Sequence, residues 1–233
     1  MLENVLTYER DLFLWLNGLH NAVLDNFLWI YTGWPVWFPF ILFLIIAFIY
    51  KKPWREWLPV IGGLVLVAGM GVLSVEFLIK PYFTRFRPTF HPDFMNDIKT
   101  LYDFSGEGLY GFISGHATFS FALATFTSLL LRYKPYTITV YIWAIIMVYS
   151  RIYLGVHFLT DILAGTLMGI CIGLIVYYLY VVVMEKYIYP DGKYRNLTIY
   201  SSRRKKVITI TFVCYILLLL LFSSQLIFLF RPG

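Results

Sequence analysis

Long apolar runs separated by short polar segments dominate this chain of 233 residues. Several of the runs approach or exceed about 18 residues, the length at which an α-helix crosses the hydrocarbon core of a membrane. They predict membrane-spanning helices over residues 34–50, 58–79, 113–131, 136–153, 158–183 and 207–230. The pattern therefore predicts an all-α, polytopic membrane bundle of about six transmembrane helices, forming one domain over residues 1–233.

Residues 1–33 have a mixed pattern that differs from the predicted spans. Apolar residues recur at helical spacing, but polar residues such as Asp11, Asn17 and Asp25 interrupt them. This pattern is typical of helices that lie in the membrane interface instead of crossing it. The first residues also lack the basic leader of a secretory signal peptide. We expect an N-terminal interfacial segment.

Composition and charge support a membrane protein and give its orientation. The chain is 60% hydrophobic and only 14% charged, whereas soluble domains carry about 25% charged residues. The net charge of +6 comes from basic residues in short loops, which argues against nucleic acid as a partner. These loops contain Lys51, Lys52, Arg55, Arg132 and Lys134, and a basic connector covers residues 184–206. All lie on one predicted side, which the positive-inside rule makes cytoplasmic.

The opposite, outer side receives a polar loop over residues 80–112 and a turn at 154–157. In the first of these, Lys80 and Arg87 are seven residues apart and prolines follow both. Arginine offers a fork of donors and lysine a point charge, which together suit a phosphate group. Arg85 is a third cation, expected to contact either phosphate or lipid head groups. Glu76 precedes Lys80 by one helical turn, so the two are expected to pair.

Ser114, Gly115 and His116 open the third predicted span. The first turn of a helix presents unpaired N–H groups and the positive end of the helix dipole. Gly115 allows an anion to approach the backbone, and Ser114 can cap the helix or donate to phosphate. His116 is expected beside the same anion.

Ser150 and Arg151 end the fourth predicted span, and His157 and Asp161 begin the fifth, one helical turn apart. A carboxylate in that position can accept the proton on one ring nitrogen and leave the other nitrogen as a nucleophile. The other two histidines, His20 and His91, are expected to be exposed or level with lipid head groups.

These three stretches resemble the type 2 phosphatidic acid phosphatase superfamily of integral membrane lipid phosphate phosphatases. That family carries K-x6-RP, PSGH and SR-x5-H-x3-D, and the first and third patterns are intact here. In the second, Ile113 replaces the leading proline. The resemblance covers residues 80–161 and implies that His157 attacks phosphorus, that Asp161 orients it and that His116 protonates the leaving oxygen. It also implies that the phosphoryl oxygens are held by Lys80, Arg87, Ser114, Gly115 and Arg151.

The resemblance implies a phosphatase of the bacterial inner membrane with its active site facing the periplasm, no cofactor, no metal and no obligatory protein partner. Candidate substrates are lipid A, undecaprenyl pyrophosphate, phosphatidylglycerol phosphate and phosphatidic acid. One alternative is a transporter or flippase that uses the anion site without catalysis. Vanadate-dependent halide oxidation is a third hypothesis, which six apolar spans argue against.

Two further expectations concern packing. Cys171 and Cys214 lie inside apolar runs and are expected to be buried, reduced thiols. Small residues allow membrane helices to approach closely, and the second predicted span contains Gly62, Gly63, Gly69 and Gly71.

Overall fold

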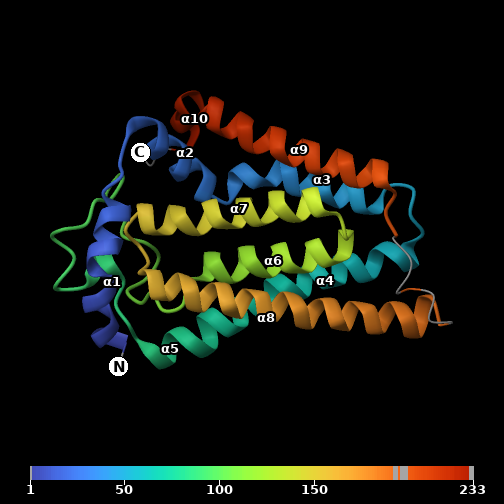
Figure 1. Ribbon diagram of the computed structural model, residues 1–233, viewed down its shortest axis with the longest axis horizontal. Helices are drawn as coiled ribbons and strands as arrows, with labels where there is room; N and C mark the ends of the chain where they lie inside the picture. Colours follow the sequence, from blue (N-terminus) through green and yellow to red (C-terminus); the bar gives the residue numbers. More distant parts are fainter. Residues whose placement is uncertain (1, 191–193, 195–198, 231–233) are drawn as a thin grey trace.

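A computed structural model describes residues 2–190, 194 and 199–230, most of them in helices that run along one axis (Figure 1). The α-helices are α1 (Leu2–Asn17), α2 (Ala22–Thr32), α3 (Phe38–Ile49), α4 (Trp54–Val72), α5 (Lys80–Phe83), α6 (Gly115–Leu131), α7 (Lys134–Tyr153), α8 (Leu159–Val183), α9 (Ser202–Leu221) and α10 (Ser223–Phe230). Short 3₁₀ segments cover Pro35–Trp37 and Pro88–Phe90, and π-helical segments cover Leu73–Ile79 and Met184–Ile188.

Among the described residues, three continuous helices are long and apolar enough to cross a membrane: Trp54–Phe83, Lys134–Tyr153 and Leu159–Ile188. Two bent pairs, Ala22–Thr32 with Pro35–Ile49 and Ser202–Leu221 with Ser223–Phe230, would raise the number to five if each pair is one span. The shorter apolar helix α6 has 17 residues. The all-α membrane bundle is thus confirmed, whereas the predicted count of six spans is not.

The bends change the interpretation of two predicted spans. The predicted span 34–50 corresponds to the helical stretch Pro35–Ile49, which passes as a candidate span only together with α2, from which it is bent by 75° after the extended Gly33. The predicted span 207–230 is broken, with an 80° turn between α9 and α10. Helix α10 folds back onto α2, where the indole nitrogen of Trp29 donates to the carbonyl of Phe230 at 2.9 Å.

Helix α6 lies at the centre of the bundle, between α4, α7 and α8. Its contact with α8 depends on three glycines spaced four residues apart. A Cβ added at Gly165, Gly169 or Gly173 would lie 2.6 Å or less from α6 or its N-cap Ser114. In α4, only Gly63 makes such a contact, with the ring of Phe126 at 2.4 Å.

The glycines that the sequence analysis selected in the second span are therefore mostly not packing positions. A Cβ at Gly62, Gly69 or Gly71 would meet nothing within 4 Å. The prediction of buried thiols is also wrong, because Cys171 and Cys214 are both exposed. Cys171 lies two residues from Gly169 and from Gly173, and so occupies the face of α8 that points away from α6.

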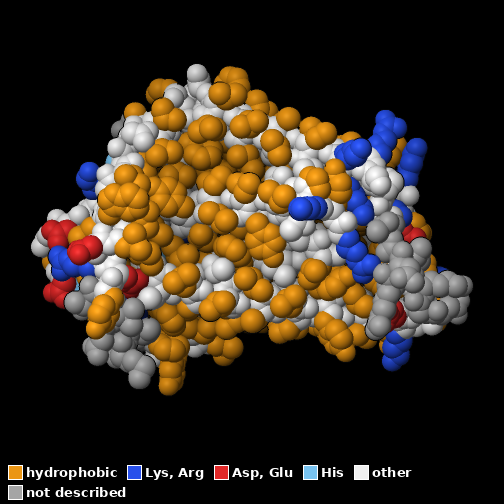
Figure 2. Space-filling view, viewed as in Figure 1, with side chains coloured by type: hydrophobic (Ala, Val, Ile, Leu, Met, Phe, Trp, Pro, Cys, Tyr) orange, Lys and Arg blue, Asp and Glu red, His pale blue; other side chains and the backbone are white. Residues whose placement is uncertain are grey.

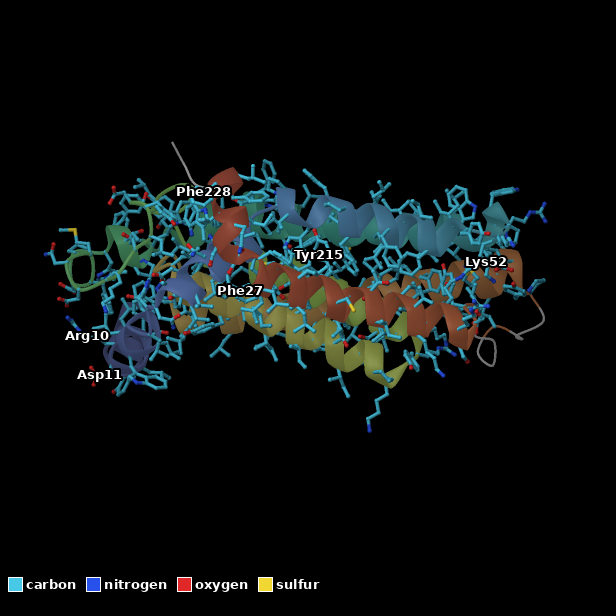
Figure 3. The ribbon with its side chains drawn as sticks, turned by 90° about the horizontal axis from the view of Figure 1, so that it is seen from above. Arg10, Asp11, Phe27, Lys52, Tyr215 and Phe228 are labelled. Atoms are coloured by element: carbon cyan, nitrogen blue, oxygen red, sulfur yellow. The ribbon has the colours of Figure 1, made fainter. Side chains whose placement is uncertain are left out.

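The two ends of the bundle differ in charge. Lysines and arginines gather at the end where α4 and α9 begin and α6 ends, while acidic side chains are seen at the opposite end (Figure 2). Figure 3 shows Lys52 at the basic end and Arg10 and Asp11 of α1 at the other. Helix α1, the loop after α5, the N-termini of α6 and α8 and the C-terminus of α7 share this second end (Figure 1).

Candidate active site

The helix that begins at Trp54 reaches the site through the π-helical segment Leu73–Ile79 and ends in α5. π-Helical turns inside α-helices occur frequently at functional sites. Here the turn carries Glu76, whose carboxylate lies 2.5 Å from the Nζ of Lys80. The expected Glu76–Lys80 pair is therefore present. At Thr84 the backbone adopts a left-handed conformation (φ 42°), which ends α5.

After α5 the chain forms a two-residue antiparallel pairing with the far end of the same loop. The amide of Arg87 donates to the carbonyl of Leu109, and the amide of Gly111 donates to the carbonyl of Arg85, both at 2.9 Å. Because Arg85 and Arg87 are two residues apart in an extended segment, their side chains leave it on the same face. Both side chains enter the interior, where each residue is only 3% exposed.

The guanidinium of Arg87 joins the loop to the third motif. It donates to the carbonyls of Glu107 at 2.7 Å, Gly108 at 2.9 Å and Val156 at 3.0 Å. Its Nη1 also lies 3.1 Å from Nε2 of His157. Since a guanidinium can only donate, Nε2 of His157 must be the unprotonated nitrogen in this contact.

The other ring nitrogen of His157, Nδ1, faces Asp161 at 3.6 Å and has no hydrogen-bond partner. Asp161 is fully buried and accepts from the amide of Phe158 at 2.9 Å and from Nη1 of Arg85 at 2.7 Å. The carboxylate thus lies behind the imidazole, on the side away from Arg87, at a distance slightly beyond hydrogen bonding. The arrangement suits an imidazole that attacks through Nε2 with its proton held on Nδ1.

Ser114 and Gly115 lie at the start of α6, directly beside the start of α8. Ser114 caps α6, its hydroxyl accepting from the amide of Ala117 at 3.4 Å, and its own amide donates to the carbonyl of Asp161 at 3.1 Å. A Cβ on Gly115 would lie 3.8 Å from Oε1 of Glu76. The helix cap is as expected, and it brings the second motif onto the third.

Arg151 and His116 complete the cluster. Nη1 of Arg151 donates to Oγ1 of Thr32 at 2.8 Å, and its Nε is buried without a partner. A buried donor without a partner is suited to receive an anion. His157 interacts electrostatically with Arg87, Arg151, His116 and Lys80, so the structure brings the charged residues of all three motifs together.

Burial and the positive charges of Arg87 and Arg151 lower the pKa of His157 well below its usual value of 6.5. At neutral pH the ring is therefore uncharged, as a nucleophile requires. Burial also lowers the pKa of Arg87, although from 12.5, so that the guanidinium keeps its charge at any physiological pH.

Three expectations are corrected at this end of the molecule. Arg85 contacts neither lipid nor the outer surface, because its guanidinium forms buried ion pairs with Glu9 and Asp161. His20 is held between Asp25 and the carbonyl of Tyr153. His91 is 7% exposed and packs against the rings of Phe94 and Phe158.

Glu9 also belongs to this end of the molecule and was not predicted from the sequence. Its only signal was a carboxylate on the same helical face as the apolar residues Leu6 and Phe13.

Among the described residues, no three histidine, cysteine or carboxylate side chains are grouped so that they could hold a metal ion.

Comparison with known proteins places this geometry in a family. The family model described as the PAP2 superfamily matches residues 57–185, more than half of the chain. The chain belongs to the PAP2 superfamily. The expected resemblance is thereby confirmed, and the matched region contains all eight candidate site residues.

Two curated relatives of this chain are named lipid A 4'-phosphatases. The one from Porphyromonas gingivalis is 37% identical over 226 residues, covering 97% of this chain and 95% of the relative. The one from Bacteroides thetaiotaomicron is 28% identical over 169 residues, covering 72% and 75%. This PAP2 protein is therefore a membrane lipid phosphatase.

A solved structure confirms the fold. It is the transmembrane PAP2-type phosphatidylglycerolphosphate phosphatase of Bacillus subtilis, with a TM-score of 0.57 and 24% sequence identity. The match covers 79% of this chain and 88% of that structure. At this identity the likeness concerns the arrangement of the helices and not the substrate.

Proposed function

We propose that this PAP2 phosphatase removes a phosphate group from a lipid A-type glycolipid, at the periplasmic face of the inner membrane, through a phosphohistidine on His157. The observation that carries the mechanism is the position of the His157 ring, with Nε2 beside Arg87 and Nδ1 facing Asp161. The choice of lipid A rests on the two relatives, one of which matches nearly the whole chain.

In the first step, Nε2 of His157 forms a bond to phosphorus while the bond between phosphorus and the lipid oxygen breaks. His116 gives its proton to that oxygen, so the lipid leaves as an alcohol. In the second step, His116 accepts a proton from water, whose oxygen attacks phosphorus as the N–P bond breaks. Inorganic phosphate and the starting enzyme result. Asp161 stabilises the imidazolium that forms when Nδ1 keeps its proton.

Charge stabilisation is the main contribution that proteins make to phosphoryl transfer. Lys80, Arg87 and Arg151 are assigned to the three phosphoryl oxygens, together with Ser114 and the amide of Gly115. The unpaired Nε of Arg151 supports this assignment. So does the position of Ser114 and Gly115 at the start of α6, where N–H groups are free to bind an anion.

The basic end of the bundle supports the periplasmic location. More lysine and arginine side chains are seen at the end where α4 and α9 begin than at the opposite end (Figure 2), and such residues are enriched in cytoplasmic loops. A site at the outer boundary of the hydrocarbon can bind a phosphate head group while the acyl chains stay in the membrane. Residues 80–112 are assigned to the periplasmic substrate loop, and the connector 184–206, partly outside the described residues, to the cytoplasm.

The test is phosphate release by the purified, detergent-solubilised protein from a panel of lipid phosphates. We expect turnover of bisphosphorylated lipid A to exceed that of phosphatidylglycerol phosphate, phosphatidic acid and undecaprenyl pyrophosphate. His157→Ala should abolish release from every substrate without lowering the amount of folded protein. A different preferred lipid would overturn the substrate assignment, and undiminished turnover by His157→Ala would overturn the mechanism.

The flippase hypothesis is disfavoured by the same structure. The charges of the three motifs gather at one end of the bundle, whereas a translocation pathway requires polar groups at the middle of the membrane.

A further inference from the structure

Helix α1 carries a buried carboxylate at the catalytic end of the bundle. Glu9 is 7% exposed, and it shares one face of α1 with Leu6, Phe13 and Asn17, all of them also buried. The helix packs against α7 and α8 near the turn that contains His157, and Figure 1 shows it lying across that end of the bundle. A buried carboxylate is costly unless it is paired and hydrogen-bonded, so its partners indicate its purpose.

The partners of Glu9 belong to the first turn of α8 and to the first motif. Its Oε2 accepts from the amide of Thr160, and its Oε1 from the hydroxyl of Thr160, both at 2.9 Å. The amide of Thr160 is one of the N–H groups that the first turn of a helix leaves unpaired. Oε1 also accepts from Nη2 of Arg85 at 2.9 Å.

Arg85 connects Glu9 to the catalytic carboxylate. Its Nη1 donates to Oδ1 of Asp161 and to the hydroxyl of Thr160, both at 2.7 Å. Its guanidinium lies 4.6 Å from the centre of the Phe158 ring, and that ring packs against Phe13 of α1 at 5.4 Å. The Glu9–Arg85 and Arg85–Asp161 ion pairs are almost fully buried, since the side chains of Glu9, Arg85 and Asp161 are 8%, 1% and 0% exposed.

We propose that Glu9 and Arg85 are positioning residues for Asp161 and His157, which makes the N-terminal helix a part of the catalytic apparatus. The proposal rests on the proposed function in one respect, namely that His157 is the nucleophile. Neither residue touches the phosphate. Arg85 fixes one oxygen of Asp161, so that the other oxygen faces Nδ1 of His157, and Glu9 fixes Arg85 together with the start of α8.

Glu9 also sets the charge beside the nucleophile. Glu9, Arg85 and Asp161 together carry one negative charge, whereas Arg85 and Asp161 alone carry none. The other charged or titratable groups that act on His157 are Arg87 of the loop, Arg151 of α7, His116 of α6 and Lys80 of α5. These four are basic. The carboxylates at this end are Asp161 and Glu9, together with Glu76, which is paired with Lys80, and Glu107, which acts on Arg87 and Arg151. Removing the charge of Glu9 therefore makes the surroundings of His157 more positive and lowers its pKa.

Glu9→Gln is the decisive variant, because it keeps the size of the side chain and one acceptor oxygen. We expect kcat to fall about tenfold while KM changes less than about twofold, since substrate contacts are intact. The acidic limb of the kcat/KM profile should move to lower pH by about half a unit or more. In the double variant Glu9→Gln/Arg85→Gln the net charge returns to minus one, so the limb should return towards its original position.

Arg10→Gln is the matched control on the same helix. Arg10 also forms an ion pair with the outer loop, 2.7 Å from Asp97, but both side chains are 40–50% exposed. It should leave kcat and the pH profile unchanged. The proposal is overturned if Glu9→Gln keeps the wild-type kcat and acidic limb, or if Arg10→Gln reproduces the same changes.

Two further outcomes can be distinguished from a failure of the Glu9 proposal. If the double variant does not fold, the comparison of Glu9→Gln with Arg10→Gln still decides the question. If His157→Ala retains activity, the proposed function fails instead, independently of the result for Glu9.

Discussion

The contact between α6 and α8 gives a prediction whose size follows from the structure. We consider the single substitution Gly169→Ala, with Gly62→Ala as its control. Both positions are glycines inside long apolar helices, and alanine has the same intrinsic advantage over glycine in each. A Cβ at Gly169 would lie 2.4 Å from the carbonyl oxygen of Thr118 and 3.0 Å from the amide nitrogen of Ala122, whereas one at Gly62 would meet nothing within 4 Å.

The obstructing atoms at Gly169 belong to the backbone of α6, so no side chain can rotate away. A carbon and a carbonyl oxygen come no closer than about 3.3 Å, so the two helices must separate by close to 1 Å. Overpacking of this kind costs about 1–3 kcal/mol. Alanine recovers about 0.8–1.0 kcal/mol of helix propensity at both positions. The gain cancels in the comparison, which leaves the packing cost as the difference.

The measurement is the midpoint of thermal unfolding in detergent, with both variants purified identically. One kcal/mol corresponds to about 2–4 °C for a chain of this size, so Gly169→Ala should unfold several degrees below Gly62→Ala. We also expect a lower kcat for Gly169→Ala, because the same helix contact continues to the site: a Cβ added at Gly165 would lie 2.6 Å from the carbonyl oxygen of Ser114. Equal midpoints, or a lower midpoint for Gly62→Ala, would refute the packing argument.

Three other predictions concern the site. Because the pKa of His157 is lowered below 6.5, the acidic limb of kcat/KM, which reports protonation of the nucleophile, should lie below pH 6.5 after correction for ionisation of the substrate. The free energy of unfolding should depend on pH in the same direction. Above pH 6.5, His157 contributes no pH dependence, whereas below it the ring is protonated in the unfolded state but not in the folded state, so the midpoint of thermal unfolding should fall. A rise would contradict the assignment. Arg87→Lys should lower kcat/KM at least 100-fold, because one ammonium cannot satisfy the four acceptors that the guanidinium contacts. Each acceptor left unpaired costs about 1–3 kcal/mol. A loss below threefold would show that only the charge of Arg87 matters. Turnover should persist after dialysis against EDTA and should be inhibited by vanadate, a mimic of the phosphorane. Loss of activity in EDTA that Mg²⁺ restores would contradict the prediction that the enzyme needs no metal.

The sequence predicted much of this site because its residues come in local motifs. His157 and Asp161 are one helical turn apart, and Ser114 begins a helix, so spacing alone placed them correctly. The partner of Asp161 could not be predicted in this way. Arg85 was ambiguous between phosphate and head groups, because its position depends on the pairing of Phe86 with Tyr110 and on the placement of α1.

Packing inside the membrane was predicted less well. The glycines at 165, 169 and 173 repeat every four residues and therefore share a helix face, a signal that was present in the sequence and was missed. The bends at Gly33 and after Leu221 had weaker signals, since each lies within a nearly continuous apolar run. Hydropathy measures apolar length, whereas the direction of a helix depends on tertiary contacts such as that between Trp29 and Phe230.

In the proposed mechanism, His157 forms a covalent bond to the phosphoryl group of the lipid. A rapid-quench experiment with lipid A labelled in its phosphate tests it directly, with the protein digested under alkaline conditions, because the N–P bond is labile to acid. We expect label on the peptide that contains His157, appearing before free phosphate and absent from His157→Ala. Release of labelled phosphate in a single turnover, with no label on the protein at any time and with His157→Ala equally active, would contradict it.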